Sequence, residues 1–256
     1  IKKSEMELCQ KNGVTEVIEV QIGNDGIALA ESNAGPKLAL TRKDIYLALA
    51  ANPMGKPNTA KTWKDVNASL PAIPIKVLGP PSTSGTRDAF AELILEKGCE
   101  EANPEAKGLK DSDKNKFENL CLLIRSDAAY VDSGENDNLI VQKLSTDPNA
   151  LGIFGYSYLV ENKQRLHGVP IDGVTPSYET IAGNSYPGAR ALYIYVKKQH
   201  LKAVPGLKEF LAQYAQMWAP DGPLVKRGLI ASPQAADDAA TKAIDSETVL
   251  DAASLK

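Results

Sequence analysis

The stretch of residues 84–87, Ser-Gly-Thr-Arg, has the residue types and spacing best suited to a chemical task in this sequence. Ser84 is a good helix N-cap, and the first turn of a helix presents free N–H groups and a partial positive charge. Gly85 lets a ligand approach the backbone, Thr86 adds a second hydroxyl, and Arg87 adds a fork of donors. Together these features predict a binding site for an oxyanion at the start of a helix.

The sequence around this motif predicts a strand, a tight turn and a helix. Residues 75–78 form a short, β-branched run, and Gly79-Pro80-Pro81 ends it because proline supplies no ladder donor. After Ser84, apolar residues between positions 90 and 95 fall near helical spacing on one face. Gly98 is expected to end this helix as its C′ residue.

Simpler interpretations of the same residues stay open. Ser84 could cap the helix without binding a ligand, and Arg87 could be a surface arginine in the first turn. Asp88 is the acid beside the motif. We favour compensation of the helix dipole as its role over acceptance of a proton from a bound anion.

The sequence lacks the motifs that common classes of enzyme use. The two histidines, His167 and His200, lie far apart in the sequence, and there is no G-x-S-x-G elbow, P-loop or G-x-G-x-x-G motif. No cluster has metal-ligand spacing, and a polar surface loop explains Asp132, Glu135 and Asp137. We therefore predict a binding protein rather than an enzyme, with no catalytic residue, cofactor or metal.

Length and composition exclude several classes of protein. The chain has 256 residues, 43% of them hydrophobic, and can bury a large core as one domain or two lobes. Its net charge of −3, without a Lys/Arg block, argues against a protein that binds nucleic acid or a membrane surface. No apolar run approaches the ~20 residues that span a bilayer. Because the chain begins with Ile1, the absence of a signal peptide says nothing about its compartment.

The three cysteines match no zinc or C-x-x-C pattern. A bridge between Cys99 and Cys121 would contribute about 3 kcal/mol in the chain-entropy model. Two buried free thiols fit the sequence equally well. In an exported protein, Cys9 would be left without a partner.

Strands alternate with helices along the chain, which predicts an α/β fold whose sheet is covered by helices. Strands are expected at residues 14–21, 27–30, 75–78, 151–156 and 191–196. A turn at residues 24–26 is expected to separate the first two strands. Helices are expected after Thr41, after Ser84, after Asn136, over 204–218 and near the end of the chain.

The segment 80–90 resembles the ligand loop of periplasmic phosphate-binding proteins, the solute receptors of phosphate ABC importers. Five further segments resemble the same family in the same order: 23–27, 40–46, 134–138, 152–157 and 186–196. The resemblance therefore covers the chain from about Ile1 to Val196.

This resemblance implies a type II periplasmic-binding-protein fold, in which two α/β lobes joined by crossing strands seal one phosphate in the cleft between them. One lobe would take residues 1–24 plus 193–256, and residues 25–192 would form the other lobe, which carries the motif. The implied function is to capture inorganic phosphate and deliver it to the membrane permease of an ABC importer. The implied location is periplasmic, or extracytoplasmic and membrane-anchored in a Gram-positive organism. We expect a monomer that binds no nucleic acid.

The sequence departs from the family pattern in two places. Family members begin with a further β-α-β stretch that carries a phosphate loop and a proton-accepting aspartate, and nothing in this chain matches it. The first lobe is therefore expected to be incomplete relative to the family. Many relatives also place an arginine four residues before the serine of the motif, where this chain has Pro80. We expect Arg87 to supply that charge.

Two alternative functions stay open on the sequence. The chain could be a receptor for another tetrahedral oxyanion, such as sulfate or molybdate. It could also be a phosphatase-like enzyme on the same scaffold, with Ser84 or Thr86 as nucleophile, although no base or metal site stands at recognisable spacing.

Overall fold

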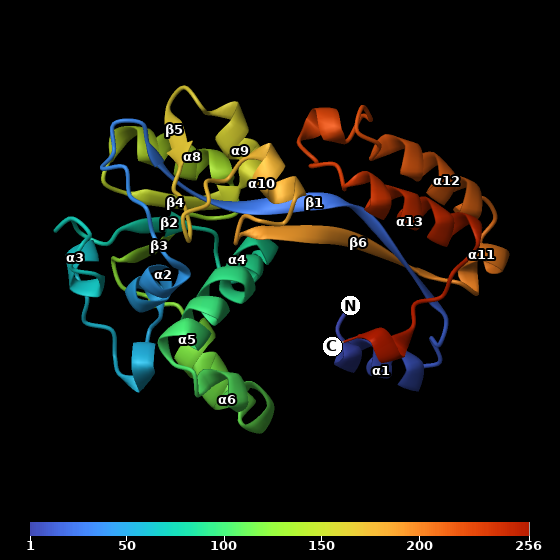
Figure 1. The fold of residues 1–256 in the computed structure, drawn as a ribbon, viewed down its shortest axis with the longest axis horizontal. Helices are drawn as coiled ribbons and strands as arrows, with labels where there is room; N and C mark the ends of the chain where they lie inside the picture. Colours follow the sequence, from blue (N-terminus) through green and yellow to red (C-terminus); the bar gives the residue numbers. More distant parts are fainter. Residues whose placement is uncertain (256) are drawn as a thin grey trace. The chain divides into compact units, whose positions relative to one another are not determined.

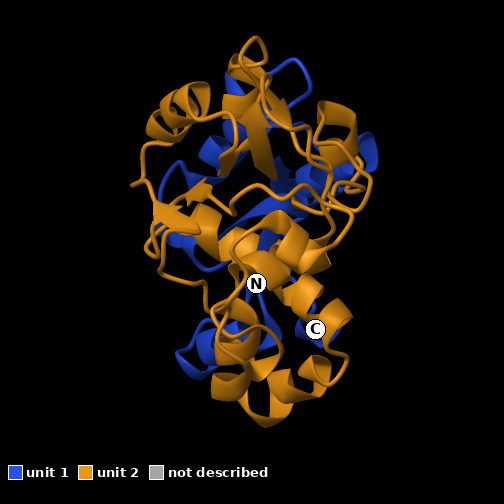
Figure 2. Ribbon diagram, turned by 90° about the vertical axis from the view of Figure 1, so that its left-hand side faces the viewer, with its two compact units in different colours: residues 1–25, 190–256 blue, residues 26–189 orange. Residues whose placement is uncertain are grey.

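The computed structural model describes residues 1–255 (Figure 1). The chain divides into two compact units, coloured separately in Figure 2. Unit 1 comprises residues 1–25 and 190–256, and unit 2 comprises residues 26–189. That these units act as two ligand-binding lobes stays a prediction.

Unit 2 is organised by a sheet with strand order β3-β2-β4-β1-β5. The strands of this path are β1 Val17–Ser32, β2 Val77–Gly79, β3 Tyr130–Asp132, β4 Leu151–Gly155 and β5 Leu166–Gly168. Strand β2 runs parallel to β3 and β4, whereas β1 runs antiparallel to β4 and β5. Because parallel strands end at the same edge of a sheet, the turns after β2, β3 and β4 share one edge.

Helices alternate with these strands in unit 2. They are α2 Arg42–Leu49, α3 Trp63–Val66, α4 Gly85–Phe90, α5 Glu96–Ala102, α6 Ala106–Ser112, α7 Lys114–Phe117, α8 Asp137–Thr146, α9 Tyr156–Glu161 and α10 Tyr178–Ala182. Shorter helical turns are the 3₁₀ turn Pro53–Gly55 and the π-helical stretches Ala91–Leu95 and Glu118–Leu122. The junctions of Ala91–Leu95 with α4 and α5 keep right-handed helical backbone angles, so one continuous helix follows the motif.

The expectation that Gly98 ends this helix is wrong, because α5 continues to Ala102. A Cβ atom at Gly98 would lie 2.1 Å from the carbonyl oxygen of Arg42 in α2. The glycine is therefore required for close packing between α2 and α5 and does not mark a helix end.

The expected turn at residues 24–26 is also wrong, because β1 is one continuous strand of 16 residues. The backbone N–H of Asn24 donates to the carbonyl of Ile230 at 2.7 Å, and that of Ile27 donates to Gly188 at 2.9 Å. These long-range backbone partners hold the segment extended, and they override the local turn preference of Asn-Asp-Gly.

Unit 1 contains the first part of β1, which pairs with β6 Ala189–Lys197. Its helices are α1 Lys3–Lys11, α11 His200–Ala203, α12 Leu207–Met217 and α13 Gln234–Asp245, with 3₁₀ turns at Val225–Arg227 and Ala252–Ser254. A hydrophobic core joins these strands to α12 and α13 through Ile18, Val20, Val196, Leu211, Trp218, Ala240 and Ile244. Each unit therefore buries apolar residues between strands and helices, as an α/β fold requires.

Cys99 in α5 and Cys121 in the π-helical stretch after α7 are both fully buried, with their Cα atoms 5.3 Å apart. That separation is within the range that a disulfide bond requires. Cys9 lies in α1 and is partly exposed.

Candidate functional site

The four motif residues lie where the turn after β2 meets the start of α4. Ser84 is the N-cap, as predicted, and its Oγ accepts the N–H of Thr86 at 3.3 Å. The first backbone bond of the helix runs from the N–H of Asp88 to the carbonyl of Ser84 at 3.1 Å. The amides of Gly85 and Arg87 precede that bond, so they have no acceptor within the helix. The site thus offers backbone donors at the positive end of a helix.

Gly85 is the exposed residue among the four of the motif. No heavy atom lies within 4 Å of the place that a Cβ atom would occupy there. The backbone amide can therefore be approached closely from solvent, as the sequence predicted for this glycine.

Two other helices begin at the same edge of the sheet as α4. Helix α8 follows β3 and is capped by Asn136, whose side chain accepts the N–H of Asn138 at 3.1 Å. Helix α9 follows β4 directly. In α/β sheets, ligands bind outside the carboxyl ends of the strands, and this is the edge on which the motif lies.

Arg87 points back across the turn toward Pro80. Its Nη1 donates to the carbonyl of Pro80 at 3.4 Å, and its Cζ lies 4.5 Å from the centroid of the Tyr130 ring. The Tyr130 hydroxyl donates to the same carbonyl at 2.7 Å. Among residues 1–255, no carboxylate forms an ion pair with Arg87, so no fixed counter-ion neutralises its charge. Sequence reasoning missed Tyr130 because it lies 50 residues from Pro80 in the chain.

Acidic residues lie at the end of β3, in the loop that follows it and at the start of α8. Thr83 donates its hydroxyl proton to Oε1 of Glu135 at 2.9 Å, and Asp132 accepts the N–H of Gly134 at 2.9 Å. Burial raises the pKa of the Asp137 carboxyl, with a smaller upward contribution from the charge of Glu135. Within residues 1–255 there is no group of three or more His, Cys, Asp or Glu side chains that could hold a metal ion.

His167 belongs to a separate structural pair. Its Nε2 lies 2.9 Å from Oε1 of Glu31, which is fully buried on the neighbouring strand β1. The N–H of Leu38 donates to the same oxygen at 2.8 Å. Burial raises the pKa of Glu31. These contacts tie the segment after β1 to β5, and in the described part of the chain neither histidine hydrogen-bonds Ser84 or Thr86 as a catalytic base would.

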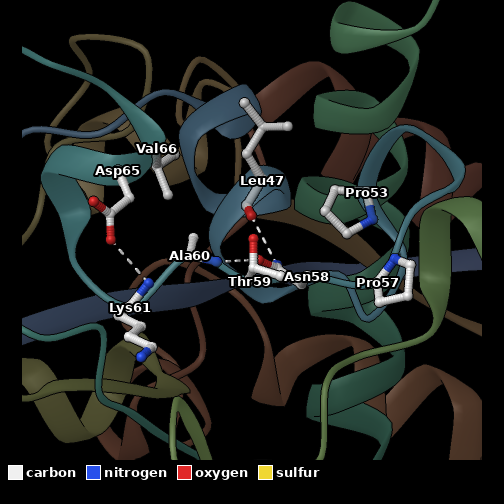
Figure 3. A pocket seen from close by; sticks show the side chains of 9 residues that line it. All are labelled: Leu47, Pro53, Pro57, Asn58, Thr59, Ala60, Lys61, Asp65 and Val66. Carbon is white, nitrogen blue, oxygen red and sulfur yellow. Dashed lines mark hydrogen bonds between the residues drawn. The ribbon is translucent and has the colours of Figure 1, made fainter.

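A hollow of about 470 Å³ lies elsewhere on unit 2 (Figure 3). It is lined by Leu47, Pro53, Pro57, Asn58, Thr59, Ala60, Lys61, Asp65 and Val66. Two polar side chains that line the hollow hydrogen-bond to the backbone of other lining residues. Nδ2 of Asn58 donates to the carbonyl of Leu47 at 2.9 Å, and Asp65 accepts the N–H of Lys61 at 3.0 Å. No motif residue lines this hollow, so it is separate from the candidate site.

Comparison with known proteins places the chain in a family. Residues 1–215 match the family described as a PBP superfamily domain. The chain belongs to the PBP superfamily. The phosphate-binding protein PstS of Staphylococcus saprophyticus is 30% identical over 220 residues, which cover 82% of this chain and 56% of that protein. The chain spans about half the length of the curated relatives it matches.

Solved structures agree with this assignment. A possible phosphate-binding protein from Planctomyces limnophilus has a TM-score of 0.66 at 25% identity, covering 96% of this chain and 78% of that one. A candidate phosphate ABC transporter substrate-binding protein from Clostridium perfringens, solved with bound phosphate, has a TM-score of 0.55 at 25% identity, covering 88% and 74%. The predicted resemblance and the type II periplasmic-binding-protein fold are therefore confirmed. No helix in residues 1–255 has the length and apolar character needed to cross a membrane.

Proposed function

We propose that this chain binds inorganic phosphate through Ser84, Gly85, Thr86 and Arg87, and that it delivers phosphate to the membrane permease of an ABC importer. The observation that carries the proposal is the exposed start of α4, where free backbone donors and the Arg87 side chain belong to the same helical turn. Among residues 1–255, no carboxylate pairs with the guanidinium. The names of the relatives support phosphate as the ligand.

The chemistry of the motif suits a phosphate oxyanion. Removing such an anion from water is costly unless its oxygens are hydrogen-bonded. The hydroxyl of Ser84 can donate to the ligand while its lone pair accepts the N–H of Thr86, and the guanidinium of Arg87 can donate two parallel bonds. At about 1.5–3 kcal/mol for each charge-assisted bond, about four bonds reach the −8 kcal/mol of micromolar affinity.

The proposal includes a compartment and an assembly state. An importer receptor works outside the cytoplasm, where cysteines are oxidised, so we expect a disulfide between Cys99 and Cys121. The chain would act as a monomer in the periplasm, or anchored to the outer face of a membrane.

The test is calorimetric titration of the chain with phosphate at neutral pH, with a matched pair of cap variants. Ser84→Ala and Ser177→Ala each remove a serine N-cap, since Ser177 caps α10 by accepting the N–H of Thr180 at 3.2 Å. Both variants should lose about 1 kcal/mol of stability. Only Ser84→Ala should also weaken phosphate binding, by at least about tenfold. Absence of phosphate binding by the folded chain, or equal loss in both variants, contradicts the proposal.

Two further measurements test the alternative functions: competition between oxyanions, and an assay for phosphatase activity. Sulfate or molybdate that displaces phosphate at equal concentration would make the chain a receptor for a different oxyanion. Turnover of a phosphomonoester that disappears in Ser84→Ala would replace binding by catalysis.

A further inference from the structure

The surroundings of Arg87 differ from those of Arg42 and Arg125, two other arginines of unit 2 that are not exposed. Arg42 pairs with Asp172 at 2.6 Å, and Arg125 pairs with Asp127 at 2.6 Å. Arg87 lies instead on the face of the Tyr130 ring, with its Cζ 4.5 Å from the centroid. A ring face attracts a cation through its quadrupole but carries no net charge. The contact therefore fixes the guanidinium in place without cancelling its charge.

Tyr130 is itself held rigidly. The residue is 6% exposed, and its hydroxyl donates to the carbonyl of Pro80 at 2.7 Å, the same oxygen that Arg87 reaches. Burial raises the pKa of this hydroxyl, so it remains a neutral donor at physiological pH. The Tyr130 hydroxyl and the Arg87 guanidinium thus donate to the same carbonyl in the turn that leads to Ser84.

Gly79 provides the space that this arrangement needs. A Cβ atom at Gly79 would lie 2.3 Å from the Tyr130 hydroxyl oxygen and 2.7 Å from the ring carbon that bears it. These are positions within the neighbouring parallel strands β2 and β3. Only glycine at this end of β2 lets the tyrosine cross the strand to Pro80.

We propose that Tyr130 is a positioning residue for the anion site: its ring and hydroxyl hold the Arg87 guanidinium at the turn that leads to Ser84 while leaving the charge free for the ligand. This inference rests on the proposed binding of phosphate at residues 84–87. A carboxylate in the same place would hold the arginine too, but it would repel an incoming anion. The Tyr130 ring holds the arginine without repelling the anion, because it carries no net charge.

A double-mutant cycle tests whether Tyr130 acts through Arg87. The variants are Tyr130→Leu, Tyr130→Phe, Arg87→Ala and the double variant Arg87→Ala with Tyr130→Leu. In phosphate titration, Tyr130→Leu should weaken binding about five- to tenfold, and Tyr130→Phe, which keeps the ring, should weaken it at most about threefold. In the Arg87→Ala background, Tyr130→Leu should cause no further loss.

The control is Tyr46→Phe, another buried tyrosine of unit 2, whose hydroxyl donates to the carbonyl of Leu120 at 3.2 Å. It should lose stability without losing phosphate affinity. Equal effects of Tyr130→Leu in both backgrounds, or a Tyr130→Phe as weak in binding as Tyr130→Leu, would overturn the inference. If Tyr130→Leu does not fold, Tyr130→Phe is carried through the same cycle, where its smaller loss of affinity should disappear in the Arg87→Ala background.

The same cycle, measured by thermal unfolding without ligand, separates this inference from the proposed function. Coupling between Arg87 and Tyr130 in the unliganded chain is expected whether or not phosphate binds. If the unfolding data show coupling between Arg87 and Tyr130 but the chain binds no phosphate, the proposed function is refuted. The result would still establish that Tyr130 positions Arg87. Phosphate binding without coupling would refute the inference alone.

Discussion

At the scale of single residues, Gly85 separates ligand binding from the stability of the helix. Its backbone is not in the left-handed region, and a Cβ atom would meet no neighbour within 4 Å. Alanine therefore fits the unliganded structure, whereas a ligand that approaches the amide would meet the added methyl group. The two properties should respond to mutation in opposite directions.

We expect Gly85→Ala to raise the free energy of unfolding by about 0.5 kcal/mol, because alanine restricts the unfolded chain. The same variant should weaken phosphate binding at least about tenfold, since one charge-assisted bond is lost. Urea unfolding and calorimetric titration measure the two effects. The control is Gly108→Ala in α6, where a Cβ atom also meets nothing. Unchanged affinity in Gly85→Ala would remove this amide from the site.

Arg125 and Asp127 give a second residue-scale prediction, on pH. The Arg125 side chain is 9% exposed; it donates to both Asp127 oxygens and to the carbonyls of Ala48 and Ala60. These bonds from Arg125 lower the pKa of Asp127 below its ordinary value. A carboxyl with a lowered folded pKa stabilises the fold above its unfolded pKa, and that contribution is lost as pH falls through the folded value.

Asp127→Asn should therefore cost about 1 kcal/mol at neutral pH, a modest value because the Asp127 side chain is 54% exposed. The difference from the parent chain should stay constant above about pH 5 and shrink below about pH 4. Urea unfolding at several pH values above pH 5 and below pH 4 measures this difference, with the exposed Asp111→Asn as control. A difference that does not change with pH would show that the charge of Asp127 contributes nothing.

At the scale of elements, local sequence signals identified three capped helix starts but misread two glycine-containing segments. Thr41, Ser84 and Asn136 are N-caps as predicted, because a cap depends only on residues within one turn. The misread segments, Gly98 and residues 24–26, are controlled by contacts with distant backbone. A glycine needed for packing looks the same in sequence as one that ends a helix.

The predicted disulfide belongs to this scale because it would connect α5 to the π-helical stretch after α7. The two cysteines are separated by 22 positions in the sequence. Cys99→Ala should lower the free energy of unfolding under oxidising conditions by about 3 kcal/mol. Chemical unfolding with and without reductant measures this, and the parent chain should approach the variant once reduced. With the disulfide, the denatured and unreduced parent chain should show one free thiol, that of Cys9. Three free thiols would count against the disulfide.

At the scale of the whole molecule, the alternation of strands and helices predicted the α/β class, and the ordered family segments predicted the type II fold. Side-chain pairings between residues that are distant in the chain were not predictable from the sequence. Tyr130 meets Arg87 and His167 meets Glu31 only because distant strands become neighbours in the sheet. Nothing in the local sequence of either partner encodes those contacts.

Because the chain has two compact units, we expect one thermal unfolding transition for each. Scanning calorimetry can then show which unit the ligand stabilises. A ligand stabilises the part that binds it by about 4 kcal/mol at 1,000 times its Kd, which corresponds to roughly 10 °C for a domain of this size. Phosphate should therefore raise the unfolding transition of unit 2, which contains residues 84–87, and sulfate should not. The Cys99→Ala variant identifies that transition, because it should lower the unfolding temperature of unit 2. A phosphate shift confined to the other transition would place the binding determinants in unit 1 and contradict the assignment to this motif.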